Sequence, residues 1–118
     1  MKITVLDRKT MGDDISFLPI ERHGELTVYD ITPPELIAER VRDAEVIIQN
    51  KAKITAEVIA SAKNLRLICE FATGYDNIDL DAARRAGVAV CNVPGYSTDS
   101  VTLFTVATVT ALASRLVT

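Results

Sequence analysis

The chain has 118 residues, of which 48% are hydrophobic, and its net charge at neutral pH is −3. This length suits a single domain with a buried core. The scattered Lys and Arg residues argue against a general nucleic-acid-binding protein, and the N-terminal residues lack the apolar length of a signal peptide.

Five short apolar runs have the composition of buried strands, and most of them are apolar on both faces. Such runs are typical of a parallel sheet that is covered by helices on each side. In chain order, the runs are residues 3–6, 26–29, 46–48, 65–71 and 88–91. Cys69 and Cys91 lie in the last two runs and fit no zinc or redox spacing. We therefore expect reduced core thiols in a cytoplasmic protein, with no metal site.

Helical patterns alternate with these runs. Thr32, followed by Pro33 and Pro34, is expected to cap the start of a helix. Thr55 and Asp79 are expected to cap two later helices. Gly24 and Gly87 predict helix ends. The expected helices cover residues 15–23, a stretch after Thr32, a stretch after Thr55, residues 80–86 and residues 101–117.

This alternation predicts an α/β fold, namely a flavodoxin-like, doubly wound parallel sheet in the strand order 2-1-3-4-5 with helices on both faces. Ligands of such folds bind beyond the carboxyl ends of the strands. The turns after strands one, three, four and five share that edge. Lys51, Thr73, Gly74 and Tyr96 are therefore expected to converge there although they are far apart in sequence.

The turn at residues 71–79 is the strongest candidate for a site. We expect Gly74 to allow a sharp turn, because glycine tolerates either sign of φ. A strand that leads through such a turn into a helix start leaves backbone N–H groups free for a small carboxylate. The alternative is an ordinary strand-to-helix turn with no ligand.

Two long motifs make a family resemblance specific. They are Ala-Thr-Gly-Tyr-Asp-Asn-Ile-Asp at residues 72–79 and Asn-Val-Pro-Gly-Tyr-Ser-Thr-Asp-Ser-Val at residues 92–101. With these motifs the chain resembles the substrate domain of NAD-dependent D-2-hydroxyacid dehydrogenases. The resemblance implies that the amides of Thr73, Gly74 and Tyr75 hold the carboxylate of a 2-hydroxy or 2-keto acid. It also implies that Lys51 or Ala52 lies on the far wall and that Tyr96 closes the pocket. Without the resemblance, Lys51 is a solvated loop lysine and both tyrosines are packing residues.

The chain departs from this family in what it lacks. Its five glycines form no G-x-G-x-x-G motif, and His23, its one histidine, matches no catalytic position of the family. Nothing corresponds to the catalytic Arg, Glu and His or to the NAD-binding domain. We therefore expect no catalytic residue and no cofactor site in this chain. It is predicted to be the isolated substrate-binding half of an enzyme, inactive alone, from an excised or redesigned domain.

The terminal segment, residues 99–117, would link to the absent cofactor domain. From Val101 to Val117 it is apolar nearly all round, but Arg115 interrupts it too early for a membrane span. We expect a helix buried on both sides, although its β-branched content leaves an extended strand open for part of it. The absent cofactor domain cannot cover the second side of this helix, so we expect a second copy of the chain to cover it, as a homodimer through Val101–Val117.

Two other functions stay open. One is a self-associating, flavodoxin-like structural module without a ligand. The other is a flavin carrier, which is disfavoured because residues 7–10 after the first strand are not a Ser/Thr-rich phosphate loop.

Overall fold

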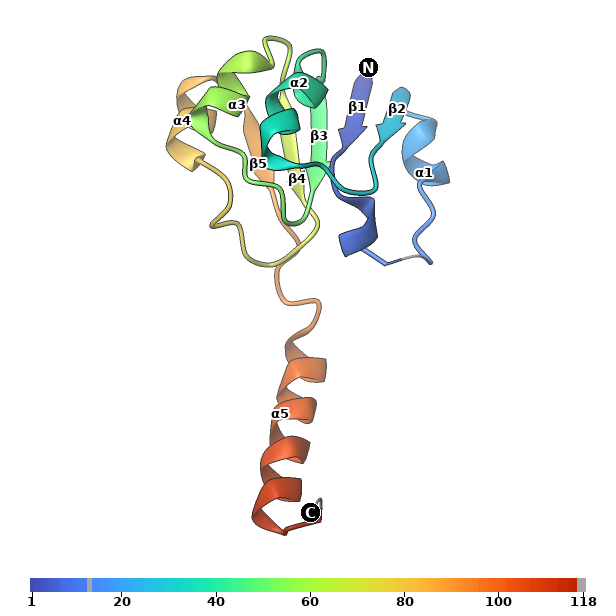
Figure 1. Cartoon of the computed structure of the whole chain (residues 1–118), viewed down its shortest axis with the longest axis vertical. Helices are drawn as coiled ribbons and strands as arrows, with labels where there is room; N and C mark the ends of the chain where they lie inside the picture. The colour runs from blue at the N-terminus through green and yellow to red at the C-terminus, as the bar shows by residue number, and fades with distance from the viewer. Residues whose placement is uncertain (13, 117–118) are drawn as a thin grey trace.

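The computed structural model describes residues 1–12 and 14–116. A five-stranded, all-parallel sheet in the order β2-β1-β3-β4-β5 forms its centre, which confirms the predicted fold (Figure 1). All four residues of β3 are buried, as the continuous apolar run predicted for a central strand. The strands are β1 (Lys2–Val5), β2 (Glu25–Val28), β3 (Val46–Gln49), β4 (Leu67–Glu70) and β5 (Ala89–Cys91).

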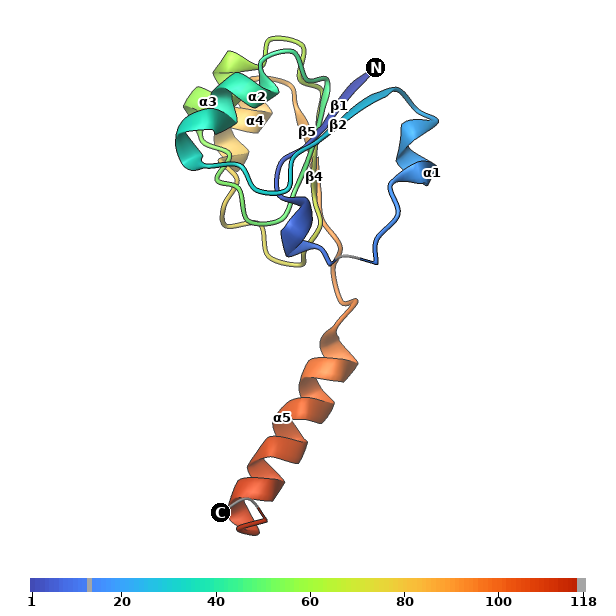
Figure 2. The same ribbon diagram turned by 45° about the vertical axis from the view of Figure 1, so that its right-hand side comes forward.

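Helices lie on both faces of the sheet, but unequally. Three helices, α2 (Ile37–Val41), α3 (Ala56–Ser61) and α4 (Leu80–Arg85), cover one face, and α1 (Leu18–Glu21) lies on the other (Figure 2). The larger core cluster fills the side of the three helices. On the other side, Ile3, Val5, Val46 and Ile48 form a small cluster against residues such as Phe17 and Ile20. Two short 3-10 helices, η1 (Arg8–Thr10) and η2 (Pro34–Leu36), complete the connections.

Several predicted helix ends are confirmed. Thr55 accepts a hydrogen bond from the N–H of Val58 at 3.4 Å, and Asp79 accepts one from the N–H of Ala82 at 2.8 Å. Gly87 adopts a φ of +70°, and the N–H of Val88 then donates to the Ala83 carbonyl at 2.9 Å. This left-handed residue closes α4 with the hydrogen bonds of a Schellman motif.

The prediction that Thr32 caps a helix is wrong. The N-cap of η2 is Pro33, and Thr32 instead donates its hydroxyl to the Leu6 carbonyl at 2.6 Å. Thr32 is buried, so its hydroxyl satisfies a buried carbonyl rather than a helix N–H. The helix expected at residues 15–23 is also shorter and spans only Leu18–Glu21.

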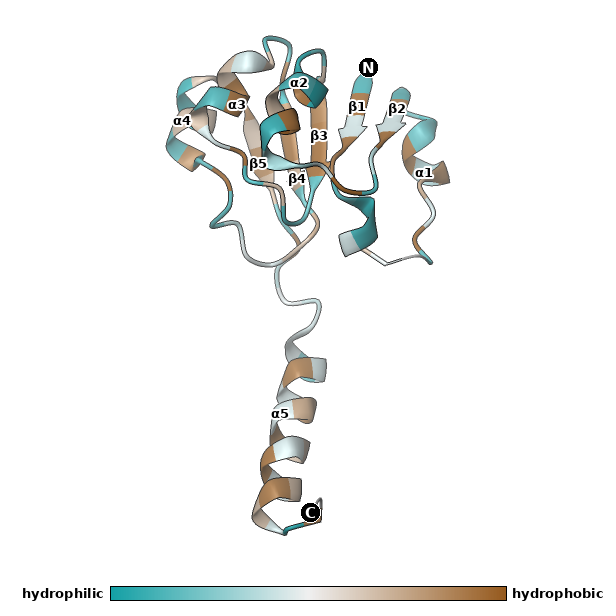
Figure 3. Cartoon of the chain, in the orientation of Figure 1, coloured by the Kyte–Doolittle hydropathy of each residue, from teal (hydrophilic) through white to brown (hydrophobic). Residues whose placement is uncertain are grey.

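The last helix, α5 (Thr98–Ala113), extends away from the sheet as a separate arm (Figures 1 and 3). None of its described residues is buried, so the expectation of a helix buried on both sides is wrong for the single chain. The left-handed Gly95, with φ +75°, lies in the linker that turns the chain away. The extended alternative is also excluded, although residue 117 lies outside the described part.

The sequence offers Thr98 or Ser100 as the cap of the last helix, and the structure differs from this prediction. Ser97 precedes the helix without a capping hydrogen bond, so neither Thr98 nor Ser100 is the cap. Among the described residues, no helix combines the length and apolarity that a bilayer crossing requires.

Because α5 extends away from the sheet, the two cysteines are less buried than the sequence predicted. Cys69 is half-buried and Cys91 is exposed, so the prediction of two core thiols is wrong for Cys91. The reason is that α1 lies beside β2, at the far edge of the sheet, while α5 covers neither β4 nor β5 (Figure 1).

Candidate functional site

The loops at the carboxyl edge of the sheet are joined to one another by hydrogen bonds. The N–H of Ile54 donates to the Asn77 carbonyl at 2.8 Å, and the N–H of Asp79 donates to the Ile54 carbonyl at 2.9 Å. On the other side, the Asn92 amide donates to the Thr73 carbonyl at 2.7 Å. The turn at residues 71–79 is therefore held between the loops that follow β3 and β5.

Asp7, at the end of β1, fixes the loop that contains two predicted site residues. Its buried carboxylate accepts hydrogen bonds from the backbone N–H groups of Asn50, Lys51 and Ala52. The Ala52 side chain is itself part of the hydrophobic core. The backbone of this loop is therefore occupied by the protein, and only the exposed Lys51 side chain is available to a ligand.

A buried polar cluster lies beneath this loop. Glu70 is 1% exposed, and its Oε2 accepts a hydrogen bond from the Gln49 side chain. Its Oε1 has no hydrogen-bond partner among the described residues. The Asn77 amide donates to Gln49 Oε1 at 3.0 Å and to the Ala52 carbonyl at 3.1 Å. The cluster thus ties the end of β4 to the loop that Asp7 holds.

The pKa of Glu70 is raised, chiefly because burial disfavours the charged form. The amides of Asn77 and Gln49 oppose the rise, the negative charge of Asp7 adds to it, and the positive charge of Lys51 opposes it. Sequence reasoning overlooked Glu70 and Gln49. The available signal was a charged residue inside an apolar strand run, directly before the turn.

Lys51 and Gly74 meet at a shallow hollow of about 240 Å³. Asn50, Asp76 and Asn77 complete its lining. The backbone hydrogen bonds of the described residues leave the N–H groups of Thr73, Gly74 and Tyr75 without a protein acceptor. Lys51 and the free amide of Gly74 therefore belong to one hollow, in which Asp76 is the only acidic lining residue.

Gly74 has a different role from the expected one. Its φ is not positive, so the conformation there does not require glycine. A Cβ at Gly74 would meet no atom within 4 Å, so the missing side chain leaves open space beside the hollow. The free amides also belong to the turn rather than to a helix start, because α4 begins only at Leu80 and Asp79 already caps it.

The two predicted tyrosines lie elsewhere. Tyr75 lines a second hollow of about 140 Å³ together with residues that include Leu80, Val90 and Asn92. Tyr96 is 67% exposed and lies in the linker before α5. The structure therefore brings Lys51 and Gly74 to one hollow, which neither Thr73, Tyr75 nor Tyr96 lines.

The turn after β1 is where a doubly wound sheet would bind a dinucleotide or a flavin phosphate. The N–H groups of Arg8, Lys9, Thr10 and Met11 all donate to backbone carbonyls. These residues therefore do not fit a phosphate, because the turn offers it no free row of amides. The described residues also contain no group of three or more His, Cys, Asp or Glu side chains placed to hold a metal ion.

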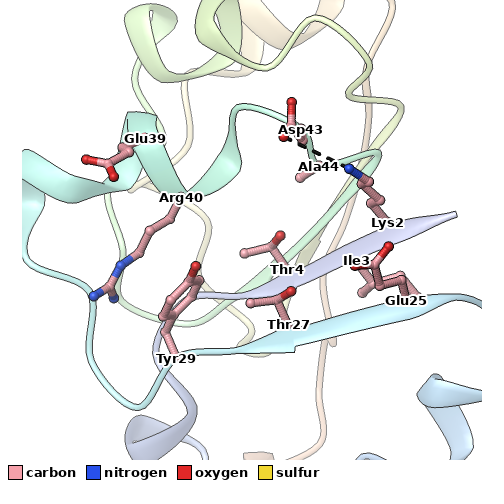
Figure 4. A pocket seen from close by; sticks show the side chains of 10 residues that line it. All are labelled: Lys2, Ile3, Thr4, Glu25, Thr27, Tyr29, Glu39, Arg40, Asp43 and Ala44. Carbon is pink, nitrogen blue, oxygen red and sulfur yellow. Dashed lines mark ion pairs between the residues drawn. The ribbon is translucent and has the colours of Figure 1, made fainter.

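A larger groove of about 290 Å³ runs between α2 and the strands β1 and β2 (Figure 4). Arg40 lies 4.0 Å from the centroid of the Tyr29 ring and donates to the Ile31 carbonyl at 3.0 Å. Lys2 pairs with Asp43 at 4.0 Å. These cations already have partners, and the groove also contains carboxylates. The groove is therefore not a favourable site for an anion.

The sequence is similar to known oxidoreductases over nearly its whole length. Residues 4–116 match the family described as D-isomer specific 2-hydroxyacid dehydrogenase, catalytic domain. A hydroxypyruvate reductase of Blautia hydrogenotrophica is 36% identical over 91% of this chain and 34% of its own length. A glyoxylate reductase of Korarchaeum cryptofilum is 39% identical over 83% of this chain and 31% of its own length. The chain thus spans about a third of the length of the curated relatives it matches.

Solved structures agree with the sequence comparison. The D-lactate dehydrogenase of Aquifex aeolicus, in complex with NAD and lactic acid, superposes with a TM-score of 0.81 and 25% identity, over 98% of this chain and 34% of the other. An acyclic imino acid reductase in complex with NADPH and D-Arg gives a TM-score of 0.79 and 26% identity, over 91% and 35%. From its motifs, its strand order and these matches, the chain belongs to the D-isomer specific 2-hydroxyacid dehydrogenase family and corresponds to the catalytic domain of that family.

Proposed function

We propose that this chain is the substrate-binding part of an NAD(P)-dependent oxidoreductase that acts on small 2-hydroxy or 2-keto acids. The observation that supports the proposal is the set of free amides at Thr73, Gly74 and Tyr75, because Gly74 lines the same hollow as Lys51. Backbone amides and a cation are the groups that a carboxylate binds best. The relatives named for hydroxypyruvate, glyoxylate and lactate point to small carboxylates of this type.

Binding by the chain alone should be weak. The hollow is shallow and most of its lining is exposed, so a bound acid would keep much of its contact with water. A dissociation constant on the order of millimolar is expected for such a half-open site. Asp76 would weaken binding further, because it places a like charge near the carboxylate.

An amide-shift titration tests this site. Glyoxylate and lactate, added to isotopically labelled chain, should shift the amide signals of residues 73–75 and of Lys51. Lactamide has nearly the same size but no charge, and it should shift them much less. Shifts that spare residues 73–75, or equal shifts from lactate and lactamide, would contradict the carboxylate site.

Two lysine variants distinguish a specific contact of Lys51 with the ligand from the general effect of losing one positive charge. Lys51→Gln should weaken lactate binding by up to about fivefold, the value of an exposed ion pair of about 1 kcal/mol. Lys53 is also exposed but does not line this hollow. Lys53→Gln is therefore the matched control, and equal losses from the two variants would exclude a specific role for Lys51.

We also propose that the chain alone does not turn over substrate. Hydride transfer requires a bound cofactor and an acid–base group, and the turn after β1 offers the cofactor no amides. Purified chain with NADH and glyoxylate should therefore leave the nicotinamide absorbance unchanged. Turnover proportional to the amount of chain would overturn this proposal.

A second candidate function is self-association through α5. Leu103 and Phe104 are 71% and 75% exposed, and apolar residues also occupy the other faces of this helix (Figure 3). An apolar helix left in water marks an interface. A second copy of the chain could cover it with the same surface, as in a twofold dimer.

Light scattering after size exclusion tests the dimer. The double variant Leu103→Gln and Phe104→His should shift a dimer toward monomer without changing the sheet. A wild-type chain that is monomeric at high micromolar concentration would exclude this association.

A further inference from the structure

We propose that Cys69 and Cys91 form a reversible dithiol site that closes to an intrachain disulfide by exchange with a small disulfide such as oxidised glutathione. The proposal goes beyond substrate binding and does not depend on it. The chain has no other cysteine, so no third thiol competes for either partner.

Strand pairing brings the two thiols together. Cys69 on β4 and Cys91 on β5 are register partners in parallel neighbouring strands, so their side chains lie on the same face of the sheet. Their sulfur atoms are 3.5 Å apart, and the Cys91 thiol donates to Cys69 Sγ. Neighbouring strands are about 4.8 Å apart, which lies within the Cα separations that disulfides span, about 4.4–6.8 Å.

The surroundings assign a different role to each thiol. Cys69 packs against the small core cluster together with Leu67 and Phe71 and is half-buried, whereas Cys91 is exposed on the edge strand. Among the described helices, none covers β4 and β5 on the cysteine side, since α1 lies beside β2 at the other edge of the sheet (Figure 1). A small disulfide can therefore reach Cys91 first, and Cys69 is the inner partner.

The acidity of the inner thiol fits this order. The pKa of Cys69 is raised to about 12, first by burial and then by the hydrogen bond and the charge of Cys91. Cys69 is therefore a poor nucleophile toward molecules in solution, because the thiolate is the reactive form. Once Cys91 carries a glutathionyl group it can no longer be a thiolate, so its hydrogen bond and its negative charge no longer raise the pKa of Cys69.

The exchange proceeds in two balanced steps. The Cys91 thiolate attacks oxidised glutathione, which forms a Cys91–glutathione disulfide and releases one glutathione. The Cys69 thiolate then attacks Cys91 Sγ, which forms the Cys69–Cys91 disulfide and releases the second glutathione. Each cysteine proton passes through water to the departing glutathione thiolate. The two protein thiols are thereby oxidised and one glutathione disulfide is reduced to two thiols.

The closed form should reopen readily. The sulfur atoms must approach from 3.5 Å to a bond length of about 2.05 Å while the strands keep their pairing. Exposed disulfides are more easily reduced than buried structural ones, and Cys91 is exposed. Excess reduced glutathione should therefore restore both thiols.

Intact mass spectrometry tests the proposal on the native chain. After incubation with oxidised glutathione, the wild type should lose the mass of two hydrogen atoms, and peptide mapping should join Cys69 to Cys91. Cys69→Ser should instead keep one glutathione on Cys91, and Cys91→Ser should react much more slowly. Cys69→Ala serves as a second variant if the serine at this half-buried position destabilises the sheet.

Three results would overturn the proposal. They are a wild type that keeps a glutathione adduct, one that stays reduced, and one that joins two chains instead of closing within one. A disulfide that resists excess reduced glutathione would overturn its reversibility.

Discussion

Asp7 and Ala52 are far apart in the sequence, yet a hydrogen bond of 2.9 Å joins the Asp7 carboxylate to the Ala52 backbone N–H. The same carboxylate accepts from Asn50 and Lys51, so one buried side chain determines the position of the loop after β3. Lys51, on this loop, lines the hollow at Gly74. The geometry of the candidate site thus depends on a residue that does not line that hollow.

Asp7→Asn should destabilise the chain markedly. The Asn amide is uncharged and has one acceptor oxygen where the carboxylate has two, so in either orientation its NH2 group replaces an oxygen that accepts from this loop. We expect a loss of about 2–4 kcal/mol in the free energy of unfolding, measured by urea titration. Asp43→Asn breaks only an exposed pair with Lys2 and should cost less than about 1 kcal/mol. Equal losses would show that Asp7 does not hold the loop.

Glu70 should give the stability of the chain a specific dependence on pH. Its pKa is raised in the folded state, so the folded chain binds this proton more tightly than the unfolded chain. The stabilisation that comes from protonation of Glu70 is therefore fully present below the pKa of an unfolded Glu, about 4.3. It is lost as the pH rises through the raised pKa of Glu70 in the folded chain.

Glu70→Gln removes this titration. The stability of the variant relative to the wild type should increase as the pH rises from about 5 to 9 in urea unfolding experiments. Glu39→Gln, at an exposed position, is the matched control for the loss of one carboxylate. A Glu70→Gln curve parallel to that of the wild type would contradict the buried, raised carboxyl group.

Two glycine substitutions should have opposite effects. Gly74→Ala should leave stability within about 1 kcal/mol, because its φ is not positive and a Cβ meets open space. It should nevertheless weaken lactate binding, since the added methyl group lies beside the hollow that a carboxylate would enter. Gly87→Ala should cost about 1 kcal/mol or more at φ +70° and leave binding unchanged. Calorimetry and the amide-shift titration measure the two effects, and a reversal of the pattern would refute both assignments.

Removal of α5 should leave the sheet intact. At a concentration at which the full chain is monomeric, a chain of residues 1–96 should have a free energy of unfolding within about 1 kcal/mol of the full chain, since no described residue of α5 is buried. Each large apolar side chain that packed on the sheet would contribute about 1.5–3 kcal/mol. A loss above about 3 kcal/mol would therefore show that α5 covers the sheet in solution. In the monomeric full chain, Leu103→Gln should likewise leave the free energy of unfolding nearly unchanged.

The fold could be predicted from the sequence because its signals are local and repeated. A buried parallel strand must be apolar on both faces, so each run could be recognised by itself, and right-handed crossovers then leave few strand orders. The caps Thr55 and Asp79 and the helix end at Gly87 were equally local, since each satisfies backbone groups within a few residues. The motif that contains Gly74 also identified the candidate turn.

Other features depended on contacts between distant segments. Thr32 meets Leu6, Asp7 meets the loop at Lys51, and Cys69 meets Cys91 only because the sheet brings their strands together. Glu70 became a buried carboxyl group for the same reason, since burial depends on the elements that cover a strand. The sequence of α5 showed that the segment is apolar and favoured a helix but left an extended strand open for part of it, and the direction of the helix depended on the linker and on the packing partners available. Side-chain pattern thus determined the elements and their order, while tertiary packing decided which polar groups meet and which apolar surfaces face water.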